Sequence, residues 1–151
     1  MSTLRIIPAD INMAEQMSII EKDLFADPWG KNSFRSETEN PFTTGLCAFR
    51  DELCGYIFAD GDPDSTDPVY IQKIAVKKEY HRQGIAAELL GELIRKYGED
   101  RDFVLDVRVS NYPAIMFYEK MGFVRLGGER KYFYENPREN AYTYIRSKSS
   151  D

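Results

Sequence analysis

The sequence predicts a single domain, residues 1–151, of the α/β or α+β class, in which helices flank a mixed β-sheet. A length of 151 residues is typical of one domain. Apolar residues make up 42% of the chain and charged residues 30%, which is the balance of a folded globular protein. Segments of strand and helix character follow one another in the order β-α-α-β-β-β-α-β-α-β-β, and this order favours a layered sheet.

The first half of the chain predicts a strand, two helices and a β-hairpin. Apolar residues recur at helical spacing from Met13 to Leu24, and Asp10 can cap this helix at its N-terminus. The helix ends at Asp27 because the residue before Pro28 avoids the α conformation. The strands expected in this half are Leu4–Ile7, Thr43–Arg50 and Leu53–Asp60, and the second helix is expected around Ser33–Glu39.

The second half predicts two more helices and four strands. The segment Gly84–Tyr97 carries an apolar stripe opposite charged residues, and Gly98 follows it as a C-terminal glycine. Asn111 can cap a helix that has a proline in its first turn and ends at Gly122. The strands expected in this half are Val69–Val76, Phe103–Val109, Phe123–Leu126 and Ala141–Arg146.

Composition argues against several classes of function. The net charge of −5 disfavours a nucleic-acid-binding protein, because phosphate contacts need a basic face. Two cysteines cannot form a disulfide framework, and one histidine cannot complete a histidine-rich metal site. No apolar run approaches the ~18 residues of a membrane span, and the first ten residues lack the apolar stretch of a signal peptide. We therefore expect a cytoplasmic protein with no metal and with neither a membrane nor a nucleic acid as partner.

The segment before the helix Gly84–Tyr97 has the features of an anion-binding loop. A helix N-terminus offers free backbone N–H groups and the positive end of the helix dipole. Gly84 lets an anion approach the backbone, the small Ala86 avoids a clash, and Arg82 adds positive charge. Taken alone, such a loop is more often plain architecture than a binding site.

Asp106 breaks the pattern of its strand. Phe103, Leu105, Val107 and Val109 alternate on one face of the strand, and Asp106 lies on the other. Aspartate is unfavourable in strands, and a local rule broken in an otherwise consistent element points to a functional site. A strand-end surface carboxylate paired with Arg108 or Arg82 is the alternative interpretation.

Two motifs together resemble the GCN5-related N-acetyltransferase (GNAT) family. His81-Arg82-Gln83-Gly84-Ile85-Ala86 is similar to the family's Gln/Arg-x-x-Gly-x-Gly/Ala pyrophosphate loop. The segment from Asn111 to Phe123 is similar to its Asn-x-x-Ala-x-x-x-Tyr-Glu-Lys-x-Gly-Phe helix. The resemblance covers residues 4–146 and implies a mostly antiparallel sheet flanked by about four helices, with acetyl-CoA as the acetyl donor. His81 departs from the family's Gln or Arg, and we expect it to be a solvated loop histidine rather than a general base.

Three further segments are similar to the bacterial ribosomal-protein-alanine N-acetyltransferases, a group within this family. Phe25-Ala26-Asp27-Pro28-Trp29, followed by Phe34, resembles the group's Phe-Pro-Trp loop. The segment from Leu105 to Asn111 is similar to its Leu-Glu-Val-Arg-x-Ser-Asn, and the segments 130–134 and 139–141 are similar to its Arg-x-Tyr-Tyr…Glu-Asp-Ala ending. The resemblance implies acetylation of the N-terminal alanine of a ribosomal protein, by direct attack of the amine in a ternary complex.

The resemblance also implies roles for single residues. The group's general base corresponds to Asp106 and its general acid to Tyr118, although a tyrosine at that place in a helix is ordinarily a core residue. Aspartate is one methylene shorter than the group's glutamate, which favours proton transfer through a water molecule. The residues implied to bind acetyl-CoA are Ile74, Ala75, Val76, Arg82, Gln83, Gly84, Ile85, Ala86, Ala87 and Asn111. The aromatic residues expected to line a peptide groove, or else to pack at the edge of the core, are Trp29, Phe34, Tyr132 and Tyr134.

Two other functions stay open at this point. The same enzyme chemistry could act on a small amine or a lysine side chain, and a domain of this family could bind CoA without turnover, as a sensor. The presence of both Asp106 and Tyr118 counts against a sensor. The Trp29 loop and the segment Arg130–Tyr134 favour a peptide acceptor over a small amine.

Overall fold

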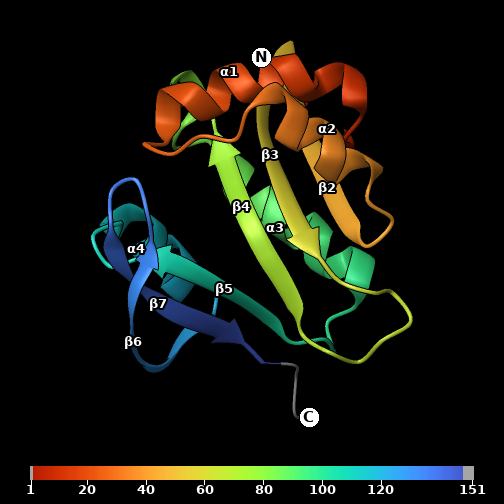
Figure 1. Ribbon diagram of the computed structural model, residues 1–151. Coiled ribbons are helices and arrows are strands. Elements are labelled where there is room, and N and C mark those ends of the chain that lie inside the picture. Colours follow the sequence, from red (N-terminus) through yellow and green to blue (C-terminus); the bar gives the residue numbers. More distant parts are fainter. Residues whose placement is uncertain (1, 148–151) are drawn as a thin grey trace.

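Seven strands form one sheet in the order β1-β2-β3-β4-β5-β7-β6 in the computed structural model, which describes residues 2–147 (Figure 1). Neighbouring strands are antiparallel except β4 and β5, which are parallel. This architecture confirms the mixed, mostly antiparallel sheet that the sequence and the family resemblance predict. The strands are β1 (Arg5–Pro8), β2 (Thr43–Arg50), β3 (Glu52–Asp60), β4 (Val69–Val76), β5 (Phe103–Arg108), β6 (Val124–Tyr134) and β7 (Glu139–Arg146).

The helices begin and end close to the predicted positions. Asp10 accepts a hydrogen bond from the N–H of Asn12 and caps the first helical turn, as its sequence position predicts. Asn111 likewise accepts from the N–H of Ala114 at the start of the fourth helix. The helices are α1 (Ala14–Leu24), α2 (Lys31–Glu39), α3 (Ile85–Tyr97) and α4 (Tyr112–Lys120), with short 3-10 turns η1 (Ile11–Met13) and η2 (Lys78–Tyr80).

The strand β3 separates two apolar cores. Ile57 and Ala59 point into a core that includes α3 and α4, whereas Tyr56 and Phe58 point into a core that includes α1 and α2. Figure 1 shows α3 behind β3 and β4. All of Leu53 to Ala59 is buried, because helices cover both faces of this strand. Burial of a large apolar side chain such as Phe58 contributes about 1.5–3 kcal/mol.

The strands β4 and β5 pair over a short length and then diverge. Their only paired residues in the part of the chain that the structure describes are Val69 with Phe103 and Tyr70 with Val104. Beyond Tyr70 the two strands spread into a V, which is clear in Figure 1. The rest of β4 is therefore bonded to β3 on one side and faces an opening on the other.

The hairpin of β6 and β7 is longer than the sequence predicts. We expect strands at Phe123–Leu126 and Ala141–Arg146, but β6 continues to Tyr134 and β7 begins at Glu139. The pairing changes register twice along β6, on either side of Arg130, and Tyr132 has a positive φ of 54°. These irregularities interrupt the alternation of apolar and polar residues by which a strand is predicted from sequence. Among residues 2–147, no helix is long and apolar enough to cross a membrane.

Candidate active site

A first cleft, the helix cleft, lies in the opening beside β4. It has a volume of about 570 Å³ and borders the N-terminus of α3. The structure brings most of the predicted acetyl-CoA-binding residues to its wall, and α4 forms the opposite wall. The predicted residues that line it are Ile74, Ala75, Val76, Arg82, Gly84, Ile85, Ala86 and Ala87.

The N-terminus of α3 is open toward this cleft. Gly84 precedes the helix with a φ of 77°, and no side chain caps the helix there. A Cβ atom added at Gly84 would meet no atom within 4 Å, so the backbone is accessible from outside. The first N–H groups of a helix have no partner within it, and these groups together with the helix dipole suit a phosphate. The loop thus has the geometry of the anion site that its sequence predicts.

Two of the predicted acetyl-CoA-binding residues lie outside the helix cleft. Gln83 is exposed and lines neither of the clefts described here. Asn111 caps α4 through its side chain and lines the second cleft instead. Their contacts with a cofactor stay a prediction.

His81 is exposed, as expected, but its ring has a specific partner. Nε2 lies 2.6 Å from the carbonyl oxygen of Val76, and because a carbonyl only accepts, Nε2 donates this hydrogen bond. On the other side of β4, the N–H of the next residue, Lys77, bonds to β3 at Cys54. His81 therefore closes the end of β4 on the side of the opening.

A second cleft, the loop cleft, lies between the α1–α2 loop and the open face of β5. Its volume is about 390 Å³, and Phe25–Trp29 form one wall. Of the residues predicted for the peptide groove, Trp29 and Tyr134 line this cleft, together with Asp106 and Tyr118. Phe34 lies instead in the core, fully buried, with its ring centroid 5.2 Å from that of Trp29. Tyr132 is largely exposed and does not line the cleft.

The two clefts share part of their lining. Ile74 of β4 and Ala114 and Tyr118 of α4 border both the helix cleft and the loop cleft. Burial raises the pKa of the Tyr118 phenol above its ordinary value, so the hydroxyl group keeps its proton at neutral pH. A protonated phenol therefore lies where a molecule in one cleft would meet a molecule in the other.

Asp106 lies on the face of β5 opposite its apolar residues, as its alternation predicts. Its side chain is only 2% exposed. Tyr70 donates a hydrogen bond of 2.7 Å to Oδ2, and Thr143 donates one of 2.5 Å to Oδ1. Nη1 of Arg130 lies 3.2 Å from Oδ2 and 3.3 Å from Oδ1. The ion-pair partner of Asp106 is thus Arg130, and not Arg108 or Arg82, which the sequence suggested.

Arg108, one of those two arginines, binds the β6–β7 turn instead. Its Nη1 donates to the carbonyl oxygen of Pro137 at 2.8 Å and lies 3.3 Å from Glu139. Its guanidinium carbon lies 4.5 Å from the centroid of the Tyr134 ring. The hydroxyl group of Tyr134 in turn donates to the backbone carbonyl of Asp106 at 3.0 Å. These contacts fix the aromatic wall of the loop cleft against β5.

A buried cluster around Glu21 was not predicted from the sequence. Glu21 is fully buried, and it accepts hydrogen bonds from the Tyr56 hydroxyl at 2.6 Å and the Trp29 backbone N–H at 3.1 Å. It also forms an ion pair with Lys73, whose Nζ lies 4.1 Å from the centroid of the Trp29 ring. Burial lowers the pKa of Lys73, and Glu21 opposes this shift. The sequence signal was a carboxylate on the apolar face of α1, one position after Ile20.

Tyr70 and Thr143 were also missed. Neither residue type breaks a strand pattern, because tyrosine and threonine are favourable in strands. Only the pairing of β5 with both β4 and β7 brings them to Asp106.

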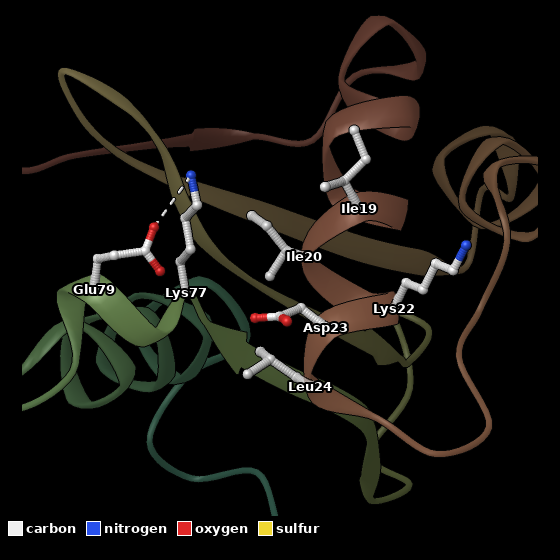
Figure 2. A pocket seen from close by; sticks show the side chains of 7 residues that line it. All are labelled: Ile19, Ile20, Lys22, Asp23, Leu24, Lys77 and Glu79. Carbon is white, nitrogen blue, oxygen red and sulfur yellow. Dashed lines mark ion pairs between the residues drawn. The ribbon is translucent and has the colours of Figure 1, made fainter.

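A third hollow, also of about 570 Å³, lies between α1 and the segment after β4. Figure 2 shows Ile19, Ile20 and Leu24 of α1 on one side and Lys77 and Glu79 on the other. The ion pair between these last two residues spans 3.7 Å. None of the hollow's lining residues lines either of the other clefts, and none is a predicted site residue. Within residues 2–147, no cluster of three or more His, Cys, Asp or Glu side chains is arranged to hold a metal ion.

Comparison with known proteins defines the class to which this fold and site belong. The sequence pattern of the acetyltransferase (GNAT) family matches residues 14–123, which include both clefts' shared residues. The chain therefore belongs to the GNAT acetyltransferase family, as its motifs indicate, and it is an acetyltransferase of that family.

The chain is similar to several N-acetyltransferases. A Bacillus subtilis protein named as a [ribosomal protein bS18]-alanine N-acetyltransferase is 37% identical over 126 residues, 81% of each chain. N-alpha-acetyltransferase 30 of Schizosaccharomyces pombe is 31% identical over 84% of this chain and 86% of its own. The crystal structure of the ribosomal-protein-S18-alanine N-acetyltransferase from Escherichia coli superposes with a TM-score of 0.82 at 25% identity, and the match covers 99% of this chain and 97% of that chain.

Proposed function

We propose that this acetyltransferase transfers the acetyl group of acetyl-CoA to the N-terminal α-amine of a ribosomal protein that begins with alanine. The observation that carries the proposal is the shared lining of the two clefts at Ile74, Ala114 and Tyr118. Acetyl-CoA in the helix cleft and a peptide N-terminus in the loop cleft would meet there. We expect the reaction to take place in the cytoplasm, where ribosomal proteins are made.

The helix cleft supplies what a long, charged thioester needs. The backbone N–H groups at the start of α3, with Arg82 beside them, would hold the pyrophosphate. The backbone of Ile74–Val76 lies along the opening and would pair with the pantetheine arm as an added strand. Ala86 and Ala87 line the cleft and leave room for the cofactor.

The loop cleft supplies the groups for acyl transfer. The amine nitrogen attacks the thioester carbonyl carbon, the C–S bond breaks, and the CoA thiolate takes a proton from the Tyr118 hydroxyl group. The amine loses its proton to Asp106, a residue on the wall of the same cleft, directly or through a water molecule. Trp29 and Tyr134 would pack against the first residues of the peptide.

An α-amine is a favourable acceptor for such a site. With a pKa of about 7.7–8.0, an α-amino group is roughly 10–15% neutral at pH 7, whereas a lysine side chain with a pKa of about 10.4 is less than ~0.1% neutral. The difference corresponds to about 3.4 kcal/mol that a lysine acetyltransferase must supply. A carboxylate acting through water is therefore sufficient for an α-amine.

The proposal is tested by thiol release from acetyl-CoA with a panel of acceptors. The panel contains hexapeptides led by alanine, including the N-terminal sequence of the organism's own S18 protein, the same peptides led by methionine, N-terminally blocked lysine peptides, and polyamines. We expect alanine-led peptides to have the highest kcat/KM. A preference for polyamines or lysine peptides would contradict a peptide α-amine as acceptor, and tight CoA binding without turnover on any acceptor would indicate a sensor.

A broader N-α-acetyltransferase is the second candidate. The observation that favours it is the similarity to N-alpha-acetyltransferase 30, which extends over most of both chains. In the same panel, equal or higher kcat/KM for methionine-led peptides would support this broader specificity over an alanine-specific one.

A further inference from the structure

The carboxylate of Asp106 accepts hydrogen bonds from two neutral side chains and one cationic side chain. Tyr70 and Thr143 are neutral, come from the neighbouring strands β4 and β7, and donate short hydrogen bonds of 2.7 and 2.5 Å. Arg130 is the only cation of the three, and its distances of 3.2 and 3.3 Å are the longest. The neutral donors come from the two strands next to β5, whereas the guanidinium reaches the carboxylate from the edge strand β6, which lies beyond β7.

Arg130 is the exchangeable member of this group. Its side chain is 53% exposed, although the carboxylate that it contacts is 2% exposed. It lies between the two register changes of β6, where Arg130 and Ala141 form the only strand pair between Leu126 and Tyr134 in the described structure. Its guanidinium carbon also lies 4.3 Å from the centroid of the Phe133 ring, so a second partner is available beside the first. A long exposed side chain with an alternative contact leaves an ion pair at little cost.

The acceptor of the proposed reaction carries the same charge as Arg130. Most α-amino groups are ammonium ions at pH 7, and an ammonium ion offers N–H donors to a carboxylate just as a guanidinium does. Asp106 lines the loop cleft into which this ammonium would enter. Each of its oxygen atoms already accepts from one neutral donor and from Arg130, so an entering cation and Arg130 compete for the same lone pairs.

We propose that Arg130 occupies, at Asp106, the position of the acceptor's α-ammonium group and is displaced by it when the peptide binds. This inference rests on the proposed function and names the side chain that a peptide N-terminus must displace. The displaced guanidinium keeps its contact with Phe133. Arg130 thus compensates the buried carboxylate in the free enzyme and makes binding selective for acceptors that bring a positive charge of their own.

The exchange is measured as peptide binding without turnover. The enzyme is saturated with CoA, which lacks an acetyl group, and is titrated calorimetrically with an alanine-led hexapeptide and with its des-amino analogue, in which propionyl replaces alanine. In Arg130→Gln we expect the affinity for the amine peptide to rise about two- to fivefold, the size of an exposed ion pair. The affinity for the des-amino analogue is expected to stay unchanged.

Arg125→Gln is the matched control. Arg125 lies on the same strand, but its guanidinium carbon is 4.0 Å from the centroid of the Tyr142 ring. This variant loses the same charge and is expected to change neither affinity. In Asp106→Asn the preference for the amine peptide should disappear, and adding Arg130→Gln to it should give no further gain.

Different results separate the inference from the proposed function. If the wild-type enzyme binds the amine peptide and the des-amino analogue equally, the α-amine is not recognised at this site and the proposed function fails. If it prefers the amine peptide, but Arg130→Gln leaves that affinity unchanged or lowers it, the exchange at Asp106 is overturned. Arg130→Lys serves if the glutamine variant does not fold, because a shorter cation should compete less and raise the affinity by a smaller factor.

Discussion

The position of Tyr118 is the basis of the catalytic role that we propose for it. Its ring belongs to the apolar core, 5.4 Å from the centroid of Phe123, while the residue borders both clefts. Burial holds the proton on the phenol. We propose that this phenol, which is protonated and borders both clefts, donates its proton to the thiolate that leaves acetyl-CoA.

Replacing Tyr118 by phenylalanine should separate catalysis from folding. The substitution removes one hydroxyl group and leaves the ring, so the free energy of unfolding should change by no more than about 0.5–1.5 kcal/mol. Turnover should fall by about 10²-fold or more, with little change in the affinity for acetyl-CoA. Urea unfolding and steady-state rates on the same preparation test this. Full activity in Tyr118→Phe would refute the general-acid assignment and leave the family membership intact.

Asp106→Asn tests the base. Asparagine keeps the shape of the side chain and its Oδ1 can still accept from one of the hydroxyl groups of Tyr70 and Thr143, while its Nδ2 donates to the other. It cannot take up a proton from the amine. We expect kcat to fall by about 10²–10⁴ at pH 7. The deficit should shrink toward about pH 9, because more of the α-amine is then already neutral. A deficit that is constant across this range in a kcat profile would assign Asp106 a positioning role.

At the scale of elements, α1 and the loop after it are held to β4 by the Glu21 cluster. Glu21 receives one hydrogen bond from the loop, one from β3 and an ion pair from β4. This cluster fixes the Trp29 side of the loop cleft, because the carboxylate binds the backbone N–H of Trp29 and the cation lies against its ring.

Removing one partner of this ion pair should destabilise the protein. In Glu21→Ala, Lys73 loses its ion-pair partner at a site where its side chain is only 12% exposed. We expect a loss of about 3–5 kcal/mol in urea unfolding, and a smaller loss in the double variant Glu21→Gln/Lys73→Met, which leaves no uncompensated charge. The double variant should also raise the KM for peptide more than that for acetyl-CoA. Glu15→Ala, at an exposed position of the same helix, is the control. A double variant less stable than Glu21→Ala would contradict this account.

At the scale of the whole molecule, the divergence of β4 and β5 determines where the cofactor can bind. Within residues 2–147 the two strands pair only at Val69 and Tyr70, and the helix cleft beside the unpaired part of β4 is bordered by α3 on one side and α4 on the other. A ligand in this cleft would contact β4, α3 and α4 together. It should therefore stabilise the fold as a whole, because it binds only the folded chain.

Acetyl-CoA at about 100 times its Kd should add about 2.7 kcal/mol to stability, which corresponds to a rise in Tm of about 5–10 °C for a chain of this size. Ala87→Glu should reduce this rise, because it puts a carboxylate beside the pyrophosphate site. Without ligand the variant should be as stable as the wild type or slightly more so, since a glutamate in the first turn suits the helix dipole. Ser36→Glu, exposed on α2, is the control in the same thermal melts. If acetyl-CoA raises the Tm of Ala87→Glu as much as that of the wild type, the pyrophosphate does not bind at the N-terminus of α3.

The sequence by itself determined the elements and the two local features on which the site is built. Helical and alternating spacing predicted the helices and most strands to within a few residues, because these periodicities are local properties of the chain. The loop before α3 and the misfit of Asp106 could be recognised for the same reason: each depends on residues within one turn or one strand. The end of β6 could not, since its register changes break the alternation.

Only the tertiary structure decided which residues surround Asp106 and how the clefts join. Spacing along a strand gives the face on which a residue lies, but not the strand that pairs with it. The order β4-β5-β7-β6 is not the order of the chain, and it brings Tyr70, Thr143 and Arg130 to one carboxylate across 73 positions of sequence, from residue 70 to residue 143. The tertiary structure likewise brings Glu21 of α1 to Lys73 of β4. A buried charge is stable only beside a partner, and here the fold supplies that partner.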